Sequence, residues 1–269
     1  MSLANESYNV GIIGVGVMGE ALLAGLISAG LQNSKISIYE KREDRAVEIT
    51  SKYGVRSVGL DEIVSNSDVV LLVTKPQDLG ALLDQVGAKF KSGALLVSFA
   101  AGKKIEFIAS KAGNTKIIRV MPNTPVLINK GMSAISLGAG VEEKQKNFVL
   151  TFLNSCGKAI VVDESLQDAV TATSGSGPAY FFAFVEEMVR GAVSLGLTEA
   201  DATTLTVQTI LGAAHMLESS GKSATTLREN VTSPNGTTAA ALAKFNEGNL
   251  GDLIANAMKA ARDRSEELA

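Results

Sequence analysis

The chain has 269 residues, of which 46 % are apolar, and its 25 basic and 28 acidic side chains give a net charge of −3. This balance disfavours binding to nucleic acid or to an anionic membrane, because both need a concentrated basic patch. One cysteine excludes an internal disulfide; with no signal-peptide pattern at the start and no apolar run of about 18 residues, we expect a cytoplasmic protein without a membrane span.

The first part of the chain alternates short apolar runs with amphipathic helical stretches. The apolar runs lie at 9–13, 35–39, 68–74, 94–99, 116–121, 131–137 and 158–162. The clearest helical stretches lie at 17–29, 43–53 and 103–112. Several runs are apolar throughout, which is typical of parallel strands buried on both faces, so the pattern predicts a doubly wound α/β sheet over residues 1–163.

Residues 164–269 have a different character, because the strand-like runs stop and long helical patterns follow. These patterns cover 177–195, 199–220 and 236–268, and we expect the last to break near Gly248. An all-helical part of this size cannot hide all its apolar faces by itself. We therefore expect these faces to be buried against the sheet domain, against a second subunit, or against both.

A glycine-rich turn follows the first predicted strand, with Gly14, Gly16 and Gly19 in GxGxxG spacing. In a dinucleotide site the first glycine makes the tight turn, the second lets the pyrophosphate approach the backbone, and the third lets helix and strand pack closely. The start of the following helix, at Val17 and Met18, offers amide donors to the phosphates. The position at the front of a βαβ series predicts a dinucleotide-binding site.

The end of the second predicted strand bears on the choice of coenzyme. Glu40 stands 21 residues after Gly19, where an acidic side chain can bind the adenosine ribose hydroxyls of NADH. Lys41 and Arg42 follow at once, and a basic pair can hold the 2′-phosphate of NADPH. The residues leave both coenzymes open.

Three later strand ends carry unusual turns, and in open parallel sheets ligands lie beyond the carboxyl ends of the strands. We expect these turns to contribute to coenzyme binding. The residues concerned are Lys75, Pro76, Ala100, Ala101, Gly102, Pro122 and Asn123.

The motifs KPQ, AAG, RVMPNTP, SGSGPAY (174–180) and NVTSPNGTT (230–238) together resemble the pyrroline-5-carboxylate reductases. The resemblance implies a Rossmann-like dinucleotide domain and an all-α dimerisation domain, with active sites at the interface of a homodimer and, in many such enzymes, a further assembly into decamers. It also implies hydride transfer from NADPH or NADH to the C=N bond of 1-pyrroline-5-carboxylate, which gives L-proline in the last step of proline biosynthesis.

The resemblance assigns substrate binding to two polar segments. In the 230–238 loop, amide and hydroxyl donors would hold the substrate carboxylate, and Thr238 would donate to the ring nitrogen. Ser174 and Ser176 would lie close to substrate or nicotinamide. The other residues assigned in the loop are Val231, Thr232, Ser233, Gly236 and Thr237 on the substrate side and Asn230 on the coenzyme side.

Two alternative functions are compared with this interpretation. A 3-hydroxyacid dehydrogenase would need a lysine base on the helix after the domain junction, and residues 178–196 contain no lysine. A regulatory protein that only binds the dinucleotide would not need the polar loop. His215 and Cys156 are interpreted as structural, and we expect no metal site, because the sequence has no cysteine–histidine cluster.

Overall fold

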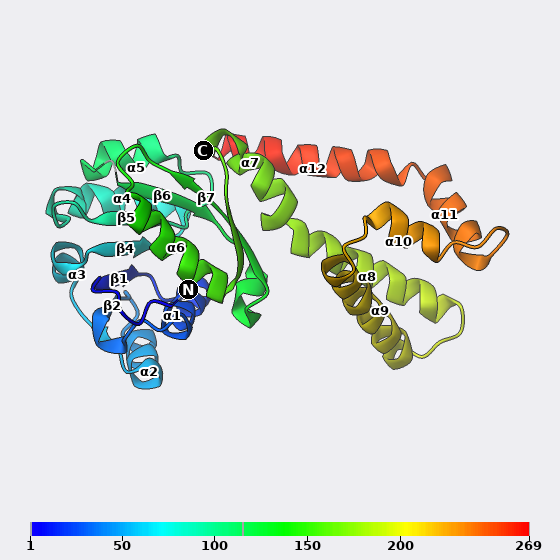
Figure 1. The fold of residues 1–269 in the computed structure, drawn as a ribbon, viewed down its shortest axis with the longest axis horizontal. Coiled ribbons are helices and arrows are strands. Elements are labelled where there is room, and N and C mark those ends of the chain that lie inside the picture. The colour runs from blue at the N-terminus through cyan, green and yellow to red at the C-terminus, as the bar shows by residue number, and fades with distance from the viewer. Residues whose placement is uncertain (1, 115, 269) are drawn as a thin grey trace. The chain divides into compact units, whose positions relative to one another are not determined.

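The computed structural model describes residues 2–114 and 116–268, and an eight-stranded sheet forms the core of its first compact unit (Figure 1). The strands follow the spatial order β3-β2-β1-β4-β5-β6-β7-β8. Their bounds are β1 (Val10–Ile13), β2 (Ile36–Tyr39), β3 (Arg56–Ser57), β4 (Val69–Leu72), β5 (Leu95–Ser98), β6 (Ile117–Met121), β7 (Gly131–Leu137) and β8 (Gly157–Val161).

The sheet is parallel from β3 to β6, as predicted, but β7 runs antiparallel to β6. The chain between these two strands holds only a 3₁₀ turn, Thr124–Ile128, whereas a parallel neighbour needs a crossover of about a dozen residues or more. β8 returns parallel to β7 through a helical crossover. The two-residue strand β3 is too short to give a pattern, and the sequence did not predict it.

Helices cover both faces of the sheet in the first part of the chain (Figure 1). α1, α2 and α5 were predicted close to their observed bounds, whereas no bounds were predicted for α3, α4 and α6; the sequence indicated only that a helix could start at Pro76 and that one ends at Cys156. The bounds are α1 (Val17–Ser28), α2 (Glu43–Tyr53), α3 (Leu60–Asn66), α4 (Pro76–Val86), α5 (Ile105–Ala112), α6 (Glu143–Ser155) and α7 (Gln167–Val170).

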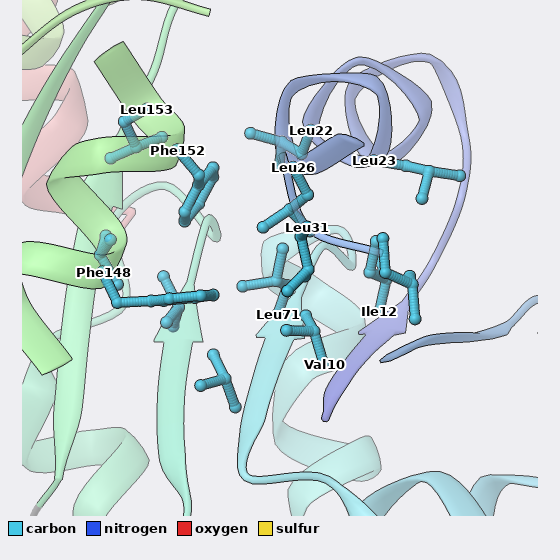
Figure 2. Close-up of a cluster of buried hydrophobic side chains, with 14 of the residues drawn as sticks. Val10, Ile12, Leu22, Leu23, Leu26, Leu31, Leu71, Phe148, Phe152 and Leu153 are labelled. Atoms are coloured by element: carbon cyan, nitrogen blue, oxygen red, sulfur yellow. The ribbon is translucent and has the colours of Figure 1, made fainter. Parts of the chain in front are cut away.

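Alternation along the strands produces two apolar cores, one on each face. Val10 and Ile12 of β1 pack with α1 and α6, whereas Ile13 packs with α4 and α5 on the other face. Figure 2 shows Phe148 and Phe152 of α6 facing the leucines of α1 across the first core. These cores fix the strand ends from which the site is built.

The chain divides into two compact units at Ser176, and the segment from Ala261 onward belongs with the sheet unit. The sequence placed the boundary at residue 163. The buried Gln167 side chain donates to the Ala134 carbonyl and to the Ser136 hydroxyl, and Ser265 donates to Asp168 at 2.7 Å. These bonds attach α7 and the last helical turns to the sheet unit, although their local sequence is helical like that of the second unit.

The second unit, residues 177–260, consists of helices. The predicted break in the last pattern is confirmed, because one helix ends at Glu247 and the next begins at Leu250. A short helix that was not predicted precedes the polar loop. The bounds are α8 (Gly177–Ser194), α9 (Glu199–Ser219), α10 (Ala224–Asn230), α11 (Thr237–Glu247) and α12 (Leu250–Glu267).

Large apolar side chains remain exposed in this helical unit, including Phe181 at 64 %, Phe182 at 63 % and Leu253 at 64 %. An apolar surface of this kind is typical of a protein–protein interface. Among the described residues, no helix has the length and apolar content that crossing a bilayer requires.

We predict that Phe152→Ala lowers the free energy of unfolding of the sheet unit by about 3–5 kcal/mol, because Phe152 is fully buried and the change leaves a cavity. Urea denaturation followed by circular dichroism measures the change. Val47→Ala on α2, where the side chain is 58 % exposed, is the control and should stay within about 0.5 kcal/mol of the parent. Equal effects of the two changes would contradict this account of the core.

Candidate functional site

The carboxyl ends of the central parallel strands lie in register along one edge of the sheet. Ile13 of β1 pairs with Tyr39 of β2 and with Leu72 of β4, and Leu72 pairs with Ser98 of β5. The chain leaves β1 in one direction to reach β2 and returns on its other side to form β4. This reversal is the topological switch point at which open α/β sheets bind ligands.

The glycine loop has the geometry that each of its three glycines was predicted to require. Gly14 has φ +92°, and a Cβ there would lie 2.5 Å from the Val73 carbonyl oxygen. A Cβ on Gly19 would lie 2.1 Å from the Gly14 carbonyl oxygen, so helix and strand approach closely here. Around Gly16, by contrast, no described atom lies within 4 Å of the Cβ position. The loop is therefore closed on two sides and open where a pyrophosphate would meet the backbone.

Helix α1 begins directly at this open position, with Gly16 as its N-cap and no side-chain cap among the described residues. Val17 is 68 % exposed, and Met18 is half-buried. The first amides of a helix have no acceptor within the helix, and the helix dipole favours an anion there. The start of α1 can therefore receive the phosphates of a dinucleotide.

Behind the loop, a cluster of charged groups from α1 and α2 holds the Val15 peptide. Arg45 donates from Nε to the Val15 carbonyl at 3.0 Å and forms an ion pair with Glu20. A hydrogen bond from Lys52 lowers the pKa of Glu20 from 4.5 to about 2; burial opposes this, and Arg45 and Tyr53 add to the lowering. The sequence pattern did not single out Arg45, whose contact with the loop spans 30 residues of chain.

A cavity of about 280 Å³ lies at the switch point, and Gly14, Glu40 and Lys75 are among the predicted residues in its wall. Thr74, which was not predicted, also lines it; its buried hydroxyl has no hydrogen-bond partner among the described residues. Such an orphaned hydroxyl can bond to a ligand that enters the cavity. Arg42 is not part of this wall, although its backbone N–H donates to Glu40 at 3.2 Å.

A second cavity, of about 440 Å³, gathers predicted residues from three other segments of the sheet unit. Pro76, Ala101 and Gly102 line it together with Ser176, and Arg264 from the end of α12 completes part of the wall. Gly102 has φ +73°, a conformation that favours glycine. Small side chains here leave room for a flat ring close to the backbone.

The remaining predicted residues of the sheet edge are mainly internal. Asn123 donates to the Ser174 carbonyl at 3.1 Å and accepts from the Met132 N–H at 2.8 Å, so its amide joins three segments. Pro122 and Ala100 are buried. Ser174 lies in a π-helical turn, Thr171–Gly175, a rare form that is frequent at functional sites.

In the helical unit, the predicted loop at 230–238 runs from the last residue of α10 to the first turn of α11. Thr232 donates its hydroxyl to the Arg228 carbonyl at 2.6 Å, so this hydroxyl is already used. Gly236 N–H donates to the Ser233 carbonyl at 3.0 Å and closes a turn that holds Asn235 at φ 60°. Val231 is 62 % exposed beside this turn.

Helix α11 starts at Thr237 with Gly236 as its N-cap, and no side chain caps it among the described residues. Thr238 is the second residue of the helix and is half-buried, whereas Ser233 and Thr237 are exposed. The loop thus presents unbonded helix amides and two threonine hydroxyls at one point, which suits a carboxylate ligand.

The two reactive side chains that were interpreted as structural lie in different surroundings. His215 is exposed in the middle of α9. Cys156 is buried, burial raises the pKa of its thiol, and its sulfur packs where a Cβ on Gly25 would lie. No group of three or more metal-binding side chains occurs within residues 2–114 and 116–268.

Comparison with known proteins gives matches to both parts of the chain. Residues 164–268 match the family model described as pyrroline-5-carboxylate reductase dimerisation, and residues 9–102 match the model described as NADP oxidoreductase coenzyme F420-dependent. The pyrroline-5-carboxylate reductase of Arabidopsis thaliana is 37 % identical over 266 residues, which cover 98 % of this chain and 96 % of that protein.

Solved structures agree with this result. A pyrroline-5-carboxylate reductase from Coxiella burnetii superposes with a TM-score of 0.92 at 33 % identity, covering 98 % of this chain and 99 % of its own. The pyrroline carboxylate reductase of Plasmodium falciparum, solved with NADP bound, gives a TM-score of 0.86 at 28 % identity and covers 98 % of each chain.

We predict that Gly16→Ala leaves stability unchanged but weakens dinucleotide binding by about 10-fold or more, because the methyl group occupies the space that the pyrophosphate needs. Titration calorimetry with NADH and NADPH, and thermal melting, measure the two effects. Gly59→Ala is a matched control, since Gly59 also caps a helix in an extended conformation with no described atom within 4 Å of its Cβ position. A Gly16→Ala protein with parental affinity would remove this glycine from the site.

We predict that Glu20 makes the free energy of unfolding depend on pH in the acid range. Because its folded-state pKa lies below the ordinary value, its contribution is complete above about pH 4.5 and is lost as the pH falls towards 2. Glu20→Gln should therefore be less stable at pH 7 and should lose less stability over this window, as measured by urea midpoints at each pH.

The matched control for this prediction is Glu62→Gln, which breaks an exposed ion pair with Arg56 and should change little. Parallel pH profiles for the parent and Glu20→Gln would show that Glu20 does not act in this way.

Proposed function

The chain belongs to the pyrroline-5-carboxylate reductase family, and we propose that it reduces the C=N bond of 1-pyrroline-5-carboxylate with NADPH or NADH to give L-proline. The observation that carries the proposal is the glycine loop, which is blocked at Gly14 and Gly19 and open at Gly16, at the switch point of the sheet. This geometry fits a dinucleotide pyrophosphate. NADP in the Plasmodium relative supports the same class of coenzyme.

On the coenzyme side, we assign the phosphates to the backbone of Gly16 and the first amides of α1. The cavity with Glu40, Thr74 and Lys75 in its wall would take the adenosine end. The cavity lined by Pro76, Ala101 and Gly102 would then lie along the nicotinamide end, because these residues follow the next strands of the same edge. A bound reduced nicotinamide supplies the hydride.

On the substrate side, we assign the carboxylate to the amides at the start of α11 and to the hydroxyls of Ser233 and Thr237. These groups attract an anion without a full positive charge. Thr238 follows one residue later, and its hydroxyl would donate to the ring nitrogen.

The reaction needs few catalytic groups. A hydride adds to the ring carbon of the C=N bond, and the nitrogen ends with one proton from water, so the protein has to position the ring, exclude water and stabilise the nitrogen. This demand agrees with an exposed His215 outside the polar loop and with a loop made of small hydroxyl side chains.

We infer a homodimer as the working form. The dimerisation model matches residues 164–268, and the helical unit exposes side chains such as Phe181, Phe182 and Leu253 that a second copy would bury. A second copy of the chain that covers these side chains would also supply its 230–238 loop to a shared active site.

The dehydrogenase alternative is not favoured, because α8 carries no lysine that could act as the base and because the full-length relatives share the reductase name. A purely regulatory role would leave the loop amides and Thr238 without a use, and turnover distinguishes it from the reductase.

We predict that the purified protein oxidises NADH or NADPH when 1-pyrroline-5-carboxylate is added, with formation of proline, and does not oxidise lactate or 3-hydroxybutyrate.

Thr238→Ala should lower kcat by about 10-fold or more, as expected for the loss of one positioned donor, and Thr238→Ser should recover most of the rate.

The matched control is Thr204→Ala on α9, whose hydroxyl donates to the Ala200 carbonyl and has no other partner in the described part of the chain. Its kcat should equal that of the parent. Absence of turnover in the parent would overturn the function, whereas turnover with an unaffected Thr238→Ala would overturn only the role of Thr238.

A further inference from the structure

The Glu40 carboxylate is fixed beside the glycine loop. It follows the last residue of β2 and accepts the Val15 N–H on Oε2 at 3.0 Å and the Arg42 N–H on Oε1 at 3.2 Å. Both oxygens are therefore held by backbone donors, and the side chain cannot turn away without breaking two charge-assisted hydrogen bonds.

The peptide that holds Glu40 is itself fixed by burial and by a hydrogen bond. Val15 is fully buried, and its carbonyl accepts the hydrogen bond from Arg45 Nε on the opposite side of the peptide. Arg45 is held in turn by ion pairs with Glu20 and Glu48. The negative charge of Glu40 consequently stays at one place in the wall of the 280 Å³ cavity.

The remaining acceptor capacity of Glu40 matches an unmodified ribose. A carboxylate offers about four lone-pair positions, and two are used by Val15 and Arg42. The other two can accept the 2′- and 3′-hydroxyls of the adenosine ribose. A 2′-phosphate brings no such proton and places a second anion against a carboxylate that cannot move.

The cations near Glu40 do not offset the negative charge of its carboxylate. Arg42 is absent from the cavity wall and its side chain is exposed. Lys41 and Lys75 do line the cavity, but both are exposed too, and a solvated lysine contributes little to binding at one point. Asp78 adds a second carboxylate to the same wall.

From this geometry we infer that Glu40 is the specificity-determining residue of the coenzyme site and that it selects NADH over NADPH. The inference rests on the proposed function for the presence of a nicotinamide coenzyme, and it names the member of that class that this chain takes. Arg45 is a positioning residue, which acts on Glu40 through the Val15 peptide.

Binding measurements without substrate test the inference. In titration calorimetry, the parent should bind NADH at least about 10-fold more tightly than NADPH, as expected for one fixed like charge at the ribose. Glu40→Gln, which removes the charge and keeps the size, should reduce this ratio several-fold or reverse it. Glu43→Gln on the first turn of α2 is the matched control and should leave the ratio unchanged, because Glu43 is outside the cavity wall.

A pair of fragments locates the selection at the ribose. Adenosine 5′-monophosphate and adenosine 2′,5′-bisphosphate differ only in the 2′-phosphate, and the parent should prefer the former, whereas Glu40→Gln should lose that preference. The fragments contain no nicotinamide, so their binding does not depend on imine reduction. Failure of this inference can therefore be distinguished from failure of the proposed function, which the turnover assay tests.

Three outcomes would overturn the inference. They are tighter binding of NADPH by the parent, an unchanged coenzyme ratio in Glu40→Gln, and a selective loss of NADPH affinity in Lys41→Ala or Arg42→Ala. Thermal melting of each variant establishes that it is folded. Arg45→Met should weaken binding of both coenzymes, but the preference for NADH should persist because Glu40 keeps its charge.

Discussion

The close approach of α1 to the glycine loop is the contact on which the coenzyme site depends. The Cα of Gly19 stands where any side chain would meet the Gly14 carbonyl, and Gly14 itself lies against the Val73 carbonyl of the neighbouring strand end. Two backbone segments and a helix start are thereby packed with no space for a Cβ at either glycine. The consequence appears at Gly16, where the same turn leaves open space at the head of a helix dipole.

The charges around this loop are divided between holding it and facing a ligand. Arg45 and Lys52, the cations that could have served an anionic ligand, are bound to Glu20 behind the loop. Glu40 stays at the cavity with its orientation fixed by two backbone amides, whereas Lys41, Lys75 and Asp78 of the same wall are exposed. On the proposed assignment, backbone amides would bind the phosphates and Glu40 would discriminate at the ribose.

The helical unit differs from the sheet unit in how it offers polar groups to a ligand. It keeps few apolar side chains buried, and its polar loop supplies amides and hydroxyls instead of charged groups. Reduction of a cyclic imine that carries a carboxylate needs an anion site and one donor beside the nitrogen, and the start of α11 offers both kinds of group. The exposed apolar faces connect this chemistry to self-association, because the unit that carries the loop also exposes large apolar side chains on α8 and α12.

The sequence by itself determined the features that depend on local pattern, whereas tertiary structure decided which side chains surround the loop. Apolar runs located seven of the strands, helical periodicity located α2 and the break near Gly248, and glycine spacing located the dinucleotide turn. The two-residue β3 is too short to show a periodicity, and the direction of β7 depends on its pairing with β6, which its apolar pattern does not encode. The bonds from Glu40 to Val15 and from Arg45 to Val15 span 25 and 30 residues of chain. A local pattern states what a residue can do, and packing of distant segments fixes where it lies. The sequence left Glu40 and the pair Lys41 and Arg42 as alternatives at the ribose, and the folded sheet edge puts Glu40 and Lys41, but not Arg42, in the cavity wall.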